Sequence, residues 1–275
     1  MTIHGWFATV LLFGVFTVAA VARAQSPQDR FAAAATALSE GAFDRALGEF
    51  EALADSGFEH PDASYDRAIA YIQRARSPQE KPGDLGRAVA ALVETLELRP
   101  DDRQARAALE TVRHEIAQRR IRAGREPAVV SPSLGRAVVG LLDESVWTLG
   151  ALIGSLLLSV GLGIRWLFGG APIRLAGGVT ASIGALLLVT TCPLVAAAAY
   201  YRTTSRPAVV VVPEARLLTE NGTPLDRKGS PDAHPAAPEG AKVYVLDRRG
   251  RLARIEWGST RAWVLATDLR LVATR

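Results

Sequence analysis

The chain has 275 residues, of which 49% are hydrophobic and 22% charged, and its formal net charge at pH 7 is +4. Residues 25–135 carry 15 Lys/Arg and 18 Asp/Glu, whereas residues 202–275 carry 13 and 8. So small a basic excess, confined to the tail, does not predict nucleic-acid binding. The single cysteine, Cys192, excludes a disulfide framework and a thiolate metal site, and the four histidines lack ligand spacing. We therefore expect no metal and no other cofactor.

The N-terminal segment has the pattern of a secretory signal peptide. Phe7–Ala22 is an apolar stretch of 16 residues, which is short for a membrane span. The tripeptide Ala22-Arg23-Ala24 has alanine at the two positions where a signal peptidase requires small residues. We expect cleavage after Ala24, so that residues 1–24 are removed. An uncleaved signal anchor is the alternative, and both interpretations export the residues that follow.

Within an expected domain at residues 25–125, residues 28–122 are predicted to be helical almost throughout, because apolar positions recur there at helical spacing. The segments 41–53 and 83–95 resemble each other. In each, a bulky residue is followed three residues later by alanine and, four residues after that, by another bulky residue. The expected first helices of the two units are Phe31–Leu38 and Ala63–Arg74. The sequence thus predicts two repeated helix pairs.

These repeats resemble the tetratricopeptide repeat, a helix–turn–helix unit of about 34 residues whose small residues let paired helices cross closely. Ala68 occupies the small position of the second unit, and Tyr71 the aromatic one. The resemblance implies a capping helix at Asp102–Arg122 and an insertion at about Arg76–Pro82. Such a solenoid presents a concave face that can bind a protein or peptide.

Four residues of the second unit are candidates for this protein-binding face. Packing of the tyrosines and solvation of the arginines is the alternative. The four are Tyr65, Arg67, Tyr71 and Arg74.

After a linker at residues 126–145, two closely spaced apolar segments predict a pair of membrane spans. Val146–Ile164 is 19 residues without a charge and Leu175–Tyr201 is 27, whereas a span needs roughly 20 apolar residues. An arginine stands at each end of the turn between them, residues 165–174. With an exported N-terminus, both soluble regions lie outside the membrane and this turn faces the cytoplasm. A buried helical hairpin in a soluble core is the alternative.

Small residues within the two spans predict close helix packing. In a bilayer the burial of apolar surface does not drive helices together, and small side chains let their backbones approach closely. The packing can be between the two spans or against partner helices, and chance is a further alternative, since glycine is common in membrane helices. No Asp, Glu, Lys, Arg or His lies inside either span, which argues against an ion pathway. The small residues are Gly150, Gly154, Gly177, Gly178, Ser182 and Gly184.

The tail, residues 203–275, changes to short β-branched segments with glycine turns, which predict a small β-barrel. A long polar loop, Pro213–Gly240, follows the first strand. The order of landmarks resembles a bacterial SH3-like domain: a glycine before a Val-x-Val strand, a glycine turn, and Ala262-Trp263-Val264 before the last leucine. The expected strands are Ala208–Val212, Ala241–Asp247, Arg251–Trp257, Arg261–Leu265 and Asp268–Val272.

Four arginines cluster around one turn of this tail. They can meet anionic lipid headgroups or wall polymer, and a solvated hairpin tip is the alternative. They are Arg248, Arg249, Arg251 and Arg254.

The combined order of signal peptide, repeats, two-span hairpin and SH3-like domain resembles the BatE family of the bacterial aerotolerance operon. The expected fold class is a multidomain membrane protein with an α-helical tetratricopeptide-repeat solenoid, two transmembrane helices and a small all-β SH3-like barrel. The resemblance implies the cytoplasmic (inner) membrane of a bacterium, with both soluble domains on the periplasmic or outer side. It also implies partners, namely von Willebrand factor A-domain membrane proteins and a MoxR-type ATPase system.

The leading hypothesis is a non-catalytic scaffold that binds protein partners in an envelope or oxidative-stress complex. A peptidoglycan-binding module anchored to the membrane is the alternative. A membrane enzyme is disfavoured, because adjacent Asp143 and Glu144 at the start of the first span are explained by stabilisation of a helix N-terminus.

Overall fold

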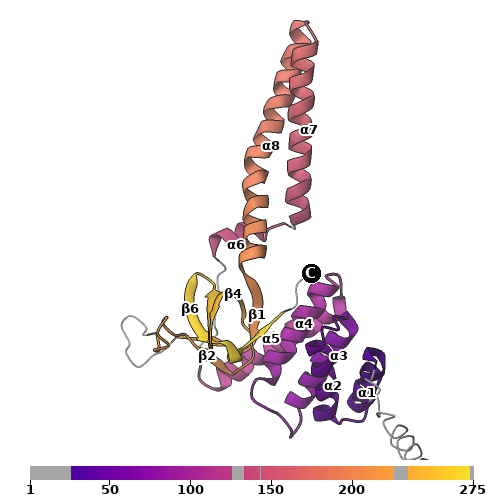
Figure 1. Cartoon of the computed structure of the whole chain (residues 1–275), viewed down its shortest axis with the longest axis vertical. Coiled ribbons are helices and arrows are strands. Elements are labelled where there is room, and N and C mark those ends of the chain that lie inside the picture. The colour runs from indigo at the N-terminus through magenta and orange to yellow at the C-terminus, as the bar shows by residue number, and fades with distance from the viewer. Residues whose placement is uncertain (1–25, 126–132, 143, 226–234, 273–275) are drawn as a thin grey trace, which may run out of the picture. The chain divides into compact units, whose positions relative to one another are not determined.

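A computed structural model describes residues 26–125, 133–142, 144–225 and 235–272. Within these residues the chain has an N-terminal helical region, two long apolar helices and a C-terminal antiparallel β-sheet (Figure 1). The first two helices belong to one compact unit, and the residues from His60 onwards form a second. The expected signal peptide lies outside the described residues.

The first unit is a helix pair, α1 (Pro27–Ser39) and α2 (Phe43–Asp55). The hydroxyl of Ser26 caps α1 by accepting a hydrogen bond from the Asp29 amide at 3.1 Å. Rings of Phe31 and Phe50 meet edge to face with centroids 6.2 Å apart. Both predicted helices are confirmed, although α1 begins earlier than expected because Ser26 and Pro27 form an N-terminal cap.

The second unit begins with α3 (Pro61–Ala75), α4 (Asp84–Leu98) and α5 (Arg103–Arg122). Ala68 and Ala88 are fully buried, so α3 and α4 approach closely. Asp102 caps α5 by accepting from the Ala105 amide at 2.9 Å, and this bond, against the opposing effect of burial, lowers the pKa of Asp102. The three predicted helices of this region are confirmed.

After the short helix α6 (Leu134–Val139), the apolar segments form α7 (Glu144–Leu167) and α8 (Ala171–Thr204), which pack antiparallel (Figure 1). Both are long and apolar enough to cross a membrane by length and composition. The connection is shorter than predicted. Both helices continue through their terminal arginines, so only residues 168–170 separate them.

Glycines bring α7 and α8 together, as their spacing predicted. A Cβ on Gly184 would lie 2.7 Å from the carbonyl oxygen of Gly154, and one on Gly177 would lie 2.9 Å from that of Gly161. Backbones at this distance exclude a side chain, so the small residues here serve packing within the hairpin.

The tail forms a five-stranded antiparallel sheet in the order β6-β5-β4-β1-β7, with a separate β2–β3 pair. Within the part of the chain that the structure describes, the pairing does not close into the expected barrel. The three-residue β7 pairs with β1, while β6 exchanges two backbone hydrogen bonds between Trp263 and Leu218. The strands are β1 (Arg206–Val210), β2 (Glu214–Arg216), β3 (Ala236–Pro238), β4 (Lys242–Arg249), β5 (Leu252–Trp257), β6 (Thr260–Leu265) and β7 (Leu269–Leu271).

Alternation places one face of this sheet in a core that includes Val210, Val243, Ile255 and Val264. The predicted loop 213–240 contains β2 and β3, which the sequence analysis missed. Short strands rich in alanine, proline and charge carry little β signal, and they form here because they pair with each other.

Candidate functional site

The N-terminus of α4 lies directly against the sheet. A Cβ on Gly86 would meet the carbonyl oxygen of Val210 at 2.6 Å, so only glycine allows this approach. The carboxylate of Glu239 accepts a hydrogen bond from the Gly86 amide at 2.7 Å. It thus lies at the positive end of the helix dipole. The helices and the sheet of the second unit therefore share one interface.

Burial raises the pKa of Glu239, and the negative charges of Asp84 and Glu80 act in the same direction. The Gly86 amide and the positive charge of Arg119 oppose this rise without cancelling it. Glu239 is thus a carboxyl group whose ionisation the fold disfavours.

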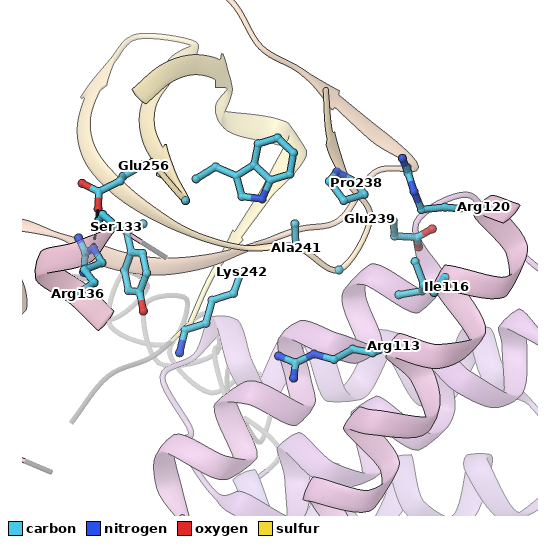
Figure 2. Close-up of a pocket in the computed structure, with 15 residues that line it drawn as sticks. Arg113, Ile116, Arg120, Ser133, Arg136, Pro238, Glu239, Ala241, Lys242 and Glu256 are labelled. Carbon is cyan, nitrogen blue, oxygen red and sulfur yellow. Dashed lines mark hydrogen bonds and ion pairs between the residues drawn. The ribbon is translucent and has the colours of Figure 1, made fainter. Parts of the chain in front are cut away.

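Beside this interface, a groove of about 480 Å³ separates α5 from the sheet (Figure 2). One wall is the stripe Arg113, Ile116, Ala117 and Arg120 of α5. Their spacing of three and four residues places them on one helix face. The other wall comes from the β3–β4 segment and the end of β5. Residues of that wall are Pro238, Glu239, Gly240, Ala241, Lys242, Tyr244, Glu256, Trp257 and Gly258.

One end of the groove is closed by a polar network around Arg136, which Figure 2 shows beside Ser133 and Glu256. Arg136 donates to Glu256 at 2.9 Å and Ser133 donates to it at 3.0 Å. The guanidinium also lies 3.7 Å from the ring centre of Tyr244 and 4.5 Å from that of Tyr201 in α8. These contacts join the segment before α7, the end of α8 and the sheet.

The same network holds Glu256 ionised. Burial by itself would raise its pKa, but the hydrogen bonds from Arg136 and Ser133 and the charges of Arg136 and Arg261 lower it. Because the negative charge of Glu256 is already neutralised by Arg136, it does not offset the other cations of the groove.

The remaining charge of the groove is positive. Its lining contains Arg113, Arg120, Arg136 and Lys242 against two carboxylates, Glu239 and Glu256. Both carboxylates accept hydrogen bonds from the chain itself. Arg113 and Lys242 reach solvent, with side chains 43% and 36% exposed, and there they pair with Glu110 at 3.1 Å and with Glu97 at 3.6 Å. Arg120 pairs with Glu214 at 3.4 Å. Ion pairs at exposed positions are weak, so an acidic ligand can compete for Arg113 and Lys242. The groove therefore favours an acidic ligand.

The floor of the groove is apolar. Ile116 is buried, and it lines the groove together with Ala117, Ala241 and Trp257. The indole Nε1 of Trp257 is buried and has no hydrogen-bond partner among the described residues.

The structure places the four predicted protein-binding residues mostly inside the helix pair. Arg74 makes two hydrogen bonds to Asp84, one of them 3.0 Å long, and their side chains are only 7% and 1% exposed. Arg67 pairs with Glu94 at 2.9 Å and is also buried.

The arginines are thus neither solvated nor on an open face, because each neutralises a buried carboxylate of α4. Tyr71 is buried beside Arg74. Tyr65 remains half-buried, and burial followed by the charges of Asp102 and Asp66 raises its pKa.

The four predicted tail arginines lie around the β4–β5 turn and are exposed. Arg249 pairs with Asp247 and Glu220, and its guanidinium lies 5.3 Å from the ring centre of Trp263. Arg248, Arg251 and Arg254 remain on the surface. The four arginines thus form an exposed cluster, but the charge of Arg249 is already balanced by Asp247 and Glu220.

The groove itself was missed by the sequence analysis. Its two walls are more than 100 residues apart in the chain, and Trp257 was predicted only as the end of a strand. The α5 stripe was the available signal, because two arginines share a helix face with Ile116 and Ala117.

No family model matches the chain, and no curated protein or solved structure matches it either.

Proposed function

We propose that the chain is a non-catalytic, membrane-anchored scaffold, and that the groove between α5 and the sheet binds an extended, acidic segment of a protein partner. The single observation that carries this proposal is the groove, with its positive rim and apolar floor. An extended segment suits it, because alternate side chains can reach the apolar floor and the cations of the rim.

Anchoring in a membrane is supported by the two apolar helices. α8 has 34 residues, about 51 Å at 1.5 Å per residue, against a hydrocarbon core of about 30 Å. One residue, Ser205, separates α8 from β1. The sheet and its groove are thereby held close to the membrane surface.

The finer assignments of the two soluble regions are part of the proposal. Alanines 68 and 88 are buried at the small positions of a tetratricopeptide repeat. Three features support the SH3-like assignment: Gly240 has a positive φ before β4, Gly250 lies between β4 and β5, and Leu269 begins β7.

The resemblance to BatE proteins suggests the setting and partners. The setting is the outer face of a bacterial cytoplasmic membrane, in an envelope or oxidative-stress complex. The partners are von Willebrand factor A-domain membrane proteins, with a MoxR-type ATPase acting from the cytoplasm. In this setting the membrane hairpin raises the effective concentration of a weakly bound segment, so the groove needs only modest affinity.

The test is recovery of crosslinked partners with the tagged, full-length chain from membranes. Arg113→Glu combined with Lys242→Glu reverses two exposed charges on the groove. Arg103→Glu combined with Arg216→Glu is the matched control at exposed positions outside it. We expect the groove variant to lose at least about tenfold of the partner protein, since each reversal opposes an acidic ligand.

Equal recovery from both variants would refute the groove as the binding site. Recovery of wall fragments in place of proteins would move the function to the peptidoglycan-binding alternative. The exposed arginines of the β4–β5 turn would then be the first residues to test.

A further inference from the structure

A second cavity, of about 660 Å³, lies where α8 meets the sheet. Its lining combines Thr203 and Thr204 from the last turn of α8 with residues of β4 and β7 and with Arg206 at the start of β1. None of these residues belongs to the groove beside α5. The cavity is therefore a separate feature of the same sheet.

The depth of this cavity follows from the helix that forms its edge. Tyr200 and Tyr201 lie in the last two turns of α8, and such rings favour the membrane interface. Thr204 is three residues further on, about 4.5 Å along the helix axis. The polar headgroup layer is about 5–7 Å thick on each side of the hydrocarbon core. The cavity thus opens at headgroup depth when α8 spans the membrane.

The charge of the cavity is positive. Three arginines line it, Arg206 at the start of β1, Arg248 in β4 and Arg270 in β7. The one carboxylate in its lining, Asp247, accepts hydrogen bonds from the Arg248 amide at 2.8 Å and from Arg249 Nε at 3.2 Å. Guanidinium groups bind phosphate oxygens through paired hydrogen bonds.

The remaining lining is apolar. Val245 and Leu269 are half-buried in the cavity, and Leu271 is 41% exposed at its edge. A free phosphate ion gains nothing from contact with apolar side chains, whereas the glycerol and upper acyl carbons of a lipid would bury them.

We propose that this cavity binds the phosphate-bearing headgroup of an anionic phospholipid, with Arg206, Arg248 and Arg270 as its ligands. The inference rests on the proposed membrane anchoring of α7 and α8. A lipid bound here would fix the sheet against the membrane and so orient the groove toward a partner. Its chemistry is that of a phosphate monoanion beside apolar carbons, as in phosphatidylglycerol.

The test uses the full chain in nanodiscs that contain equal parts of phosphatidylcholine and phosphatidylglycerol. Native mass spectrometry after release measures which lipid stays bound. The variant carries Arg206→Gln, Arg248→Gln and Arg270→Gln. The matched control carries the same change at three exposed arginines outside both cavities, Arg103, Arg216 and Arg251.

We expect the wild-type chain and the control to retain phosphatidylglycerol in preference to phosphatidylcholine. One arginine near an anionic surface changes affinity about fivefold, so the triple variant should lose roughly a hundredfold in preference. Amide hydrogen exchange of β1 and β5 verifies that the sheet is intact. If the triple variant does not fold, Arg248→Gln alone, at an exposed position, should reduce the preference about fivefold.

Retention of both lipids in equal amounts by the wild-type chain would overturn the inference while leaving membrane anchoring in place. Protection of β4 and β7 by inorganic phosphate alone, as strong as that by phosphatidylglycerol, would show a free-anion site instead. Displacement of the lipid by an acidic peptide at equal strength would show a second protein site. A chain that stays soluble outside nanodiscs would overturn the proposed anchoring itself.

Discussion

Replacing Gly86 with alanine should destabilise the chain, although alanine is the better helix former. Helix propensity alone predicts a gain of up to about 1 kcal/mol. In the fold, however, the new Cβ would lie 2.6 Å from the carbonyl oxygen of Val210 and 3.0 Å from the Cα of Val211. Both are backbone atoms, at the end of β1 and directly after it, so a side-chain rotation cannot relieve the overlap.

Overpacking of this kind costs about 1–3 kcal/mol. Displacing α4 also weakens the hydrogen bond between the Gly86 amide and the Glu239 carboxylate, which as a bond to a charged group is worth about 1.5–3 kcal/mol. Set against the propensity gain, the net loss is roughly 2–5 kcal/mol. Gly86→Ala is therefore expected to destabilise the chain, whereas helix propensity alone predicts that it stabilises it.

Amide hydrogen exchange of the full chain in detergent micelles measures this loss locally. A loss of 2 kcal/mol makes exchange in the first turn of α4 and in β1 on the order of 30-fold faster. Gly48→Ala in α2 is the matched control, because no described atom lies within 4 Å of its added Cβ. That control should slow exchange in α2 slightly. Unchanged or slower exchange in Gly86→Ala would refute the docking of α4 on the sheet.

Three further predictions concern other parts of the fold. Asp84→Asn leaves the buried Arg74 without its countercharge, and hydrogen exchange should show α3 and α4 destabilised by about 3–5 kcal/mol. Glu110→Gln removes the partner of an exposed ion pair and should cost less than about 1 kcal/mol. Similar losses in the two variants would contradict the dependence on burial. Because burial raises the pKa of Glu239, its ionisation lowers stability as pH rises above about 4.3. Glu239→Gln should therefore raise the thermal midpoint at pH 7 and change it little near pH 4, and equal shifts at both would contradict this. Gly184→Leu should separate α7 from α8 and lower the midpoint of helix unfolding in micelles, while Gly163→Leu, with no described atom within 4 Å, should not.

Elements with a strong local pattern could be predicted from the sequence. The helix pair of the second unit, the helix that follows it and all five strands of the main sheet follow from apolar periodicity and glycine turns. The two long helices were also predicted, but their ends were not. Arg165 and Arg174 suggested a ten-residue turn, whereas both helices continue through them because a charge at a helix end does not break the backbone pattern.

The candidate sites depended on contacts that no local pattern encodes. Arg67 and Arg74 looked like surface residues, since arginine is almost never fully buried unless it is paired. Their partners, Glu94 and Asp84, lie on the next helix. The groove forms because α5 faces Trp257. That arrangement depends on glycine at the N-terminus of α4, where the lack of a side chain lets the sheet pack closely. Such pairings are decided by tertiary packing, and periodicity cannot reveal them.

The central claim is that the groove binds a protein partner, and in-cell photo-crosslinking tests it most directly. A benzophenone amino acid replaces Lys242 on the groove or Arg216 at an exposed position outside it. The account predicts a crosslink from position 242 to one membrane-protein partner through an acidic segment, and no such crosslink from position 216. Equal crosslinking from both positions, or none from position 242, would contradict it.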